Sequence, residues 1–582
     1  METSLSVQEF SEYLERRLKA MSASDMKDWI RRAAAQVPPE ERAQFLTTLQ
    51  QDKTPRKETS TDLLHAIDTL RAKVEKALKE EPTWDMDHDD ETPGLDEFHP
   101  ALKRLIGEAR EVFVAKNYTL ASEAYARLFT LMSLEDEYGR CTGFPYDLDQ
   151  DEEQARYLRS IIELETAERA RLLLMAWARI RRGNGIRLDS IFKITPDVFP
   201  EQNQLLDELI PLLEAQADET CDAWLRQAIL LRQGTGGLEV LAERSGNRRP
   251  QVWVEWVAEI ARERTPQEVL AAAAKAFQHL PERHSLRADV AAHAFTAAKQ
   301  LNDEGSALQA RWEGVCSARS EEAVLDLWNL LPDVDQRRHW MQRAVEELCT
   351  PTPKVAPSER RFRPGGSIPR TEQDWPFDED DGNYDFGPGS YSSFREATRN
   401  TIALARLLAG DWQAAWSEAR KEQVLGWSGH DTCQALVVAS FLARFARTTL
   451  ETPLPPAIEA LYRSTLGVSA LDVLRETHDR GAHIRKALDL SMAYWAPNFD
   501  TGMQAVNLVI KRVDAIVDGL HRNAYARAAL ALCAAVEAMT CLGKDVEGRA
   551  LMQEVIARHK RKSAFTRALR ELQAQLAKSQ RT

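Results

Sequence analysis

One short stretch of the chain reads Lys116-Asn117-Tyr118-x-x-Ala121-x-x-x-Tyr125-x-x-Leu128. A polar turn comes first, and an aromatic residue, a small residue and two larger residues follow at helical spacing. The turn would reverse the chain, the small residue would let two helices approach closely, and the larger residues would fill the space between them. The stretch therefore predicts a helix-turn-helix unit.

The same half-motif returns far along the chain, as Gly410-Asp411-Trp412-x-x-Ala415 and as Gly543-Lys544-Asp545-x-x-Gly548-x-x-x-Met552-x-x-Val555. An isolated helix pair cannot bury its second apolar face, so neighbouring pairs must stack on it. The recurrence therefore predicts an all-α protein in which helix-turn-helix repeats stack into a superhelical array, an α-solenoid.

Apolar stripes at helical spacing support this prediction. One precedes the first turn and another lies near the end of the chain: Leu102, Leu105, Ile106, Ala109, Val112 and Phe113, then Tyr525, Ala528, Ala529, Leu532, Val536 and Met539. No stretch shows sustained alternation with β-branched residues, so we expect no sheet. Trp253 and Trp256 are expected to pack in the core on one helical face.

Length, charge and cysteine usage narrow the class of protein. A chain of 582 residues exceeds what one compact core usually holds, and a net charge of −14 argues against nucleic-acid binding by the whole surface. The seven cysteines are scattered and include no Cys-x-x-Cys, a pattern typical of reduced thiols. No secretory signal and no membrane-length apolar run is apparent. We therefore expect a cytoplasmic protein with no membrane partner.

Changes in composition predict five segments. They are a small N-terminal helical region (1–55), a helix plus acidic linker (56–99), a helical repeat block (100–350), a Pro/Gly-rich aromatic-acidic loop (351–394) and a C-terminal helical repeat block (395–582). The linker has a high density of acids and ends in Pro-Gly, which is typical of connecting segments. The later loop interrupts the helical pattern, and a loop of this length is either functional or disordered.

Aromatic and acidic residues are interleaved in the 351–394 loop, after a cluster of arginines. The residues predicted to bind a partner are Trp375, Phe377, Tyr384, Phe386, Arg361 and Arg363. Exposed aromatic residues are enriched at interfaces, and arginines suit phosphate or acidic partners. We expect the loop to dock on the protein's own concave surface or on a partner. An ordered surface loop packed under its own aromatic residues is the equal alternative.

The turn-and-stripe units resemble tetratricopeptide-like (TPR-like) repeats, although that family's Trp-Leu-Gly element and its period of about 34 residues are not reproduced. Two passages, 286–327 and 525–572, are similar to the helical regions beside the zinc finger of bacterial SWIM-type proteins. The finger itself is missing, because no Cys-x-Cys is followed by Cys-x-His. The resemblance therefore implies a helical-repeat fold but carries over no metal-binding or DNA-binding role.

No motif points to catalysis, a cofactor or a metal. The acids of 147–152 lack the Gly and Glu of a calcium loop and fit the first turn of a helix. Gly234-Thr235-Gly236-Gly237 lacks the Lys-Ser/Thr of a P-loop and reads as a turn between helices. The histidines do not form the paired short spacings of a zinc site. We therefore expect no cofactor, no metal and no enzymatic activity.

The predicted function is that of a non-catalytic scaffold or adaptor that holds another protein or a peptide on the concave face of the array. Two alternatives stay open. Basic clusters at 179–187, 360–363 and 558–562 allow a nucleic-acid-associated accessory protein, although dipole complementarity at helix ends explains the first and third. An enzyme whose site is assembled from distant helices is the second alternative.

Overall fold

The protein is helical throughout the part that the computed structural model describes. The described residues are 13, 16–22, 25–27, 30, 60–79, 95–136, 141–164, 166–180, 186–195, 197–216, 219–353, 394–425, 432–447, 452–466, 480–496 and 498–579. Within these ranges the β structure is limited to an isolated bridge between His284 and Phe394. The prediction of an all-α protein is confirmed.

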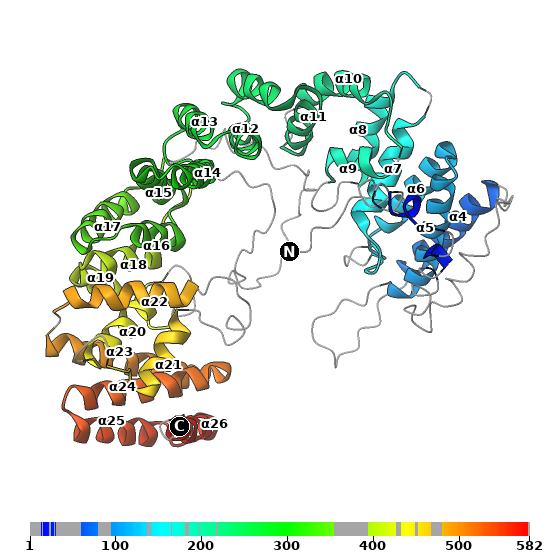
Figure 1. The fold of residues 1–582 in the computed structure, drawn as a ribbon. Coiled ribbons are helices and arrows are strands. Elements are labelled where there is room, and N and C mark those ends of the chain that lie inside the picture. Colours follow the sequence, from blue (N-terminus) through cyan, green and yellow to red (C-terminus); the bar gives the residue numbers. More distant parts are fainter. Residues whose placement is uncertain are drawn as a thin grey trace. The chain divides into compact units, whose positions relative to one another are not determined.

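The described helices group into two compact units, which divide between Val240 and Leu241. The first unit contains α4 (Ser60–Ala77), η2 (Asp96–Phe98), α5 (His99–Val114), α6 (Tyr118–Met132), α7 (Gln150–Ile162), α8 (Arg169–Ile180), α9 (Leu188–Lys193), α10 (Gln202–Glu214) and most of α11 (Glu219–Ser245). Helices that follow one another pack together: α4 on α5 and α6, α5 on α6, α6 on α7, and α7 on α8 (Figure 1).

The first turn has the structure that its sequence predicts. Asn117 caps α6, because its side-chain oxygen accepts a hydrogen bond from the Leu120 N–H. Ala121 is fully buried, α6 packs against α5, and the rings of Phe113 and Tyr118 lie 5.7 Å apart across the turn. Gly234 adopts a left-handed backbone (φ 68°) and interrupts α11, so the glycine cluster does form a turn between two helical stretches.

The acidic run before α7 serves two purposes. Asp149 caps the helix by accepting from the backbone N–H groups of Asp151 and Glu152, as expected for acids in a first turn. Glu153, in contrast, is buried and accepts hydrogen bonds from Tyr125 (2.7 Å) and Arg156 (2.6 Å). Burial and the neighbouring carboxylate raise the pKa of Tyr125. Glu153 therefore links α6 to α7 from within the core.

The second unit continues the same mode of packing. It contains α12 (Gln251–Glu263), α13 (Pro266–His279), α14 (Leu286–Gln300), α15 (Glu304–Ala318), α16 (Glu321–Leu330), α17 (Val334–Cys349), α18 (Arg399–Ala409), α19 (Trp412–Ala419), α20 (Gln434–Phe445), α21 (Pro456–Thr465), α22 (Arg480–Ser491), η3 (Met492–Tyr494), α23 (Phe499–Asp518), η4 (Arg522–Ala524), α24 (Tyr525–Cys541), α25 (Asp545–Arg558) and α26 (Ser563–Ser579).

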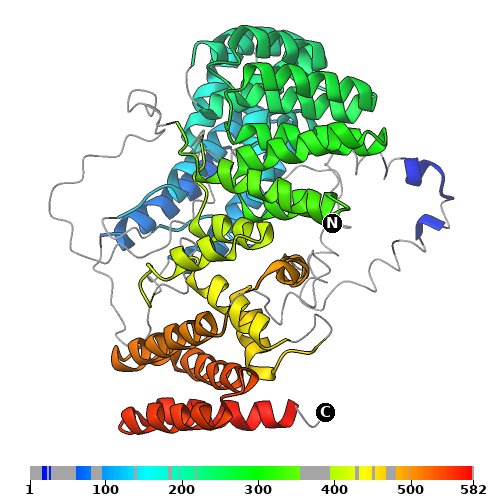
Figure 2. The same cartoon turned by 90° about the vertical axis from the view of Figure 1, so that its left-hand side faces the viewer.

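From α12 to α20 each helix packs against the next one in the chain, and many also contact the one after that (Figures 1 and 2). The order changes further on, because α22 packs back against α16 and α18, and α21 packs against α24. Trp253 and Trp256 are buried and meet edge to face at 5.7 Å, which confirms their expected place in the core.

Both later copies of the half-motif form turns in this unit. Gly410 and Gly543 have left-handed backbones (φ 78° and 76°), and Asp411 caps α19 through the Ala414 N–H. Gly548 lies where α25 crosses α24. A methyl group at that position would meet the Met539 Cβ at 3.3 Å. The absence of a side chain at this position therefore favours the close approach of these two helices.

One stretch of the described residues, Arg522–Cys541, is long and apolar enough to cross a membrane by length and composition alone. Within it, 61% of the apolar window is buried inside the structure, and α24 packs against α21, α23, α25 and α26. Its apolar surface is thus used in helix packing.

A matched pair of glycine substitutions tests the close approach of α24 and α25. The Gly548→Ala variant should be at least about 1 kcal/mol less stable to unfolding than the Gly314→Ala variant. The reason is that the methyl group added at position 548 is crowded, whereas the one added at position 314 is not. Gly314 lies in α15 with nothing within 4 Å of the added carbon, so Gly314→Ala should stabilise by about 0.5–1 kcal/mol. Urea unfolding measures both; equal gains in stability would contradict the proposed role of Gly548.

Candidate functional site

The residues predicted to bind a partner, Trp375, Phe377, Tyr384, Phe386, Arg361 and Arg363, all lie outside the described residues. Their role stays a prediction. The basic cluster 558–562 is described, and there Arg558 and His559 both contact Asp514 of α23, His559 through its Nε2 at 2.9 Å. Among the described residues, no group of three or more His, Cys, Asp or Glu side chains is arranged to hold a metal ion.

The second unit contains a pocket of about 330 Å³ between two helix turns. One turn joins α14 to α15 and the other joins α16 to α17. The apolar part of the lining is Ala298, Ala307, Leu308, Leu330, Leu331 and Pro332, and the polar part is Lys299, Asn302, Asp303, Glu304 and Gln336. The pocket therefore has apolar walls and a polar rim, the usual composition of a site that takes an apolar group.

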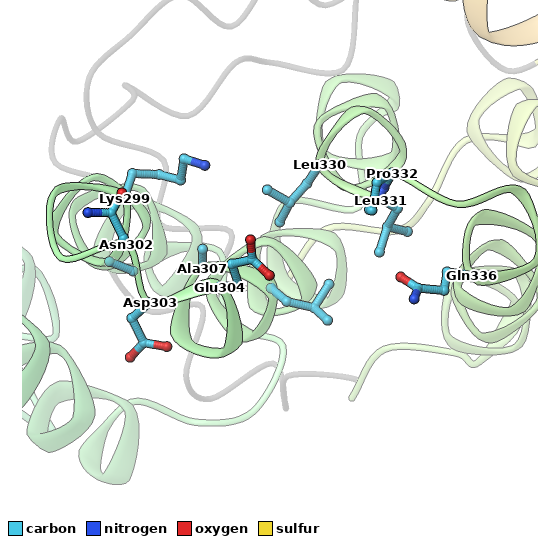
Figure 3. A pocket seen from close by; sticks show the side chains of 11 residues that line it. Lys299, Asn302, Asp303, Glu304, Ala307, Leu330, Leu331, Pro332 and Gln336 are labelled. Carbon is cyan, nitrogen blue, oxygen red and sulfur yellow. The ribbon is translucent and has the colours of Figure 1, made fainter.

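Figure 3 shows how these side chains lie. Leu330, at the end of α16, points toward Glu304 and Ala307 of α15. Lys299 and Asn302 lie on one side of the opening, and Gln336 lies on the other. Four helices thus contribute to the site, and each does so through residues at or next to one of its ends.

Helix caps fix the two turns. The carboxylate of Asp303 accepts from both the N–H (3.0 Å) and the hydroxyl (2.6 Å) of Ser306, and these hydrogen bonds lower the pKa of Asp303. Asp333 caps α17 in the same way through the Gln336 N–H. Each of the two turns beside the pocket is consequently held by a capping aspartate, and Glu304 of the rim takes no part in these caps.

An aromatic and arginine cluster lies between α15 and α17. The rings of Trp312 and Trp340 are 5.4 Å apart, and the Arg343 guanidinium lies over both, 4.6 Å and 4.4 Å from the ring centroids. Both tryptophans are half-buried and Arg343 is exposed. A guanidinium held between two indole rings loses little further freedom on meeting a carboxylate, so the cluster is preorganised to bind an acidic group.

The pocket and the cluster belong to one surface, which we call the α15–α17 groove. Glu304, Leu308 and Trp312 are four residues apart on α15 and so share a stripe of that helix. Gln336, Trp340 and Arg343 share a stripe of α17 in the same way. Glu304 and Leu308 of the first stripe and Gln336 of the second line the pocket, and Trp312, Trp340 and Arg343 form the cluster.

Beyond the cluster, Arg319 holds the two helices together. It caps α15 in a left-handed conformation (φ 50°), and its buried guanidinium donates to the carbonyls of Leu348 (2.6 Å) and Thr350 (2.9 Å) at the end of α17. Desolvation lowers the pKa of this guanidinium. These charge-assisted hydrogen bonds fix the separation of the helices at one end of the groove.

Sequence reasoning did not identify this groove. The stripe Glu304-x-x-x-Leu308-x-x-x-Trp312 is visible in the sequence, but a half-buried stripe looks the same as a core stripe until the neighbouring helix is known. The contribution of α17 comes from a separate stretch of chain.

Comparison of the sequence with protein-family models and with curated proteins found no match.

The Asp303 cap gives a direct test of the turn that forms the rim. Because the Ser306 hydroxyl is the main cause of the lowered pKa of Asp303, Ser306→Ala should move that pKa upward toward its ordinary value. In the wild type, the stabilisation from this cap is present above the unfolded-state pKa and is lost as pH falls through the lower folded-state pKa. The Ser306→Ala variant should therefore lose the stabilisation from the cap at a higher pH than the wild type does.

Carboxyl-detected NMR titration measures the change. Glu268 of α13 is the internal control, because its pKa is lowered by hydrogen bonds from Thr265 and Ser306 does not contact it. An unchanged Asp303 midpoint in the variant would contradict the assigned cap.

Proposed function

We propose that this protein is a TPR-like helical-repeat scaffold that binds a segment of a partner protein in the α15–α17 groove. The observation that carries the proposal is the combination of an apolar pocket with the Trp312–Arg343–Trp340 cluster along one pair of helices. Tryptophan and arginine dominate the energetically important positions of protein interfaces. The helix-by-helix packing of the second unit supports the repeat interpretation, because such packing leaves grooves between successive pairs.

The chemistry of the groove changes along its length. Asp303 and Glu304 lie at the pocket end and outnumber Lys299 there, so a basic residue of the partner suits this end. An apolar side chain fits between Leu330 and Leu308. At the other end, the guanidinium of Arg343 suits a carboxylate.

Helix geometry gives the distance between the two ends of the groove, and hence the spacing of the matching residues in the partner. Glu304 and Trp312 are eight residues apart, which is about 12 Å along α15. An extended peptide covers about 3.3 Å per residue, so the two ends are roughly four residues apart in the partner. The expected partner segment thus has a basic residue, an apolar residue beside it, and an acidic residue roughly four positions from the basic one.

A partner protein fits the described surface better than nucleic acid does. Arg558 and His559 of the last basic cluster contact Asp514, and the rim of the groove carries acids that would repel phosphate groups. We also predict, from the sequence, that the protein is cytoplasmic and that it has no enzymatic activity.

Selection from a random peptide library on the immobilised protein tests the proposed function. The selected peptides should share the basic, apolar and acidic pattern. Leu330→Glu and Arg343→Gln should each weaken their binding by about tenfold or more, since each removes an anchor of the groove. Val546→Glu and Arg561→Gln are the matched controls, because they introduce the same residues in place of an exposed aliphatic side chain and an exposed arginine elsewhere in the second unit. Isothermal titration calorimetry measures each affinity.

Thermal unfolding of each variant separates loss of binding from loss of structure. Peptides that bind the groove variants as tightly as the wild type would refute the proposal. Binding that a single-stranded oligonucleotide displaces, with a steep salt dependence, would favour the nucleic-acid alternative.

A further inference from the structure

A second cavity of about 300 Å³ lies where α22 packs back against α16, and Arg337 of α17 also lines it. It is separate from the α15–α17 groove, because no residue lines both. Its lining includes Trp328, Asn329, Arg337, His483, Lys486 and Leu490. None of the residues that line it is acidic, in a protein whose net charge is −14.

The arginine of this cavity is held in place. The Arg337 Nε donates to the Leu331 carbonyl (2.7 Å), and the guanidinium carbon lies 5.2 Å from the centroid of the Trp328 ring. No described residue accepts a hydrogen bond from its two terminal nitrogens or from the Lys486 ammonium. The Arg337 guanidinium and the Lys486 ammonium therefore both have N–H groups that can bind a ligand.

The described acidic residues of the neighbouring helices do not accept hydrogen bonds from these N–H groups. Asp489 of α22 forms ion pairs with Arg447 and Arg485, and Asp333 caps α17. Asp335 lies in the first turn of α17 and is not among the residues that line the cavity. Arg338 adds positive charge nearby, stacked on the Tyr494 ring at 5.6 Å.

We infer that this cavity binds a small organic anion that carries a carboxylate or phosphate group next to an apolar portion. Arg337 and Lys486 would bind the anionic group, while Leu490 and the indole of Trp328 would contact the apolar portion. The volume lies at the lower end of the range for small-molecule sites, about 300–1,000 Å³. Such a ligand would join α22 to the α16–α17 hairpin and stabilise their packing.

A small anion suits the cavity better than nucleic acid does. Nucleic-acid binding requires several phosphate contacts along a basic track. Here the cationic side chains line one cavity, and the same helices carry acids that do not line it: Asp333 and Asp335 at the start of α17, and Asp489 in α22. The arrangement therefore favours one anionic group over a chain of them.

Isothermal titration of the full chain at low ionic strength tests the inference, with succinate, inorganic phosphate and a single-stranded 20-nucleotide DNA as probes. Succinate or phosphate should bind with one-to-one stoichiometry, and the tighter of the two identifies the preferred anionic group. Lys486→Glu should weaken this binding about tenfold, and Lys486→Gln about threefold. Lys511→Glu, an exposed charge reversal on α23, is the matched control and should change the affinity less than about twofold.

Three outcomes would overturn the inference. The first is no binding of succinate or phosphate at concentrations up to about 10 mM. The second is equal weakening by Lys486→Glu and Lys511→Glu, which would indicate a response to total charge. The third is binding of the DNA alone, which would reassign the surface to nucleic acid. Lys486 is exposed, and the Lys486→Gln variant retains the length of the side chain, so the test does not depend on a core substitution.

Discussion

The structure depends on close approach between successive helices. Many of the described helices pack against both the preceding and the following helix of the chain, so one helix pair is not complete without its neighbours. Close approach requires small residues at the crossing points. Gly548 in α25 occupies such a crossing, and Ala121 in α6 and Ala415 in α19, the small residues of the other two half-motifs, are also buried. The large apolar side chains then fill the space around each crossing.

Local structure could be predicted from the sequence because its causes are local. Asn117 and Asp411 cap helices through hydrogen bonds to N–H groups three residues ahead, so a few letters suffice to recognise them. Gly410 and Gly543 end helices for a reason that is equally local, their access to the left-handed backbone region. The all-α class, the turns and most of the buried stripes were predicted correctly for this reason.

What the sequence did not predict depends on residues that are distant in the chain. The buried hydrogen bond between Glu153 and Tyr125 joins two residues that lie 28 positions apart in the chain. The α15–α17 groove combines two stripes from separate helices. The cavity proposed to bind an anion combines residues of α16 and α17 with residues of α22, about 150 positions further along the chain. Periodicity identifies which face of a helix is apolar, but it does not identify the helix that covers that face.

The position of Arg319 has a thermodynamic consequence for recognition. Its hydrogen bonds join α15 to α17 at the end of the groove that lies beyond the tryptophan cluster, while the pocket is at the opposite end, between the turns. We therefore expect the relative motion of the two helices to be smaller at Arg319 than at the pocket mouth. An occupant of the mouth would restrict that motion, so association would be opposed by conformational entropy and driven by enthalpy.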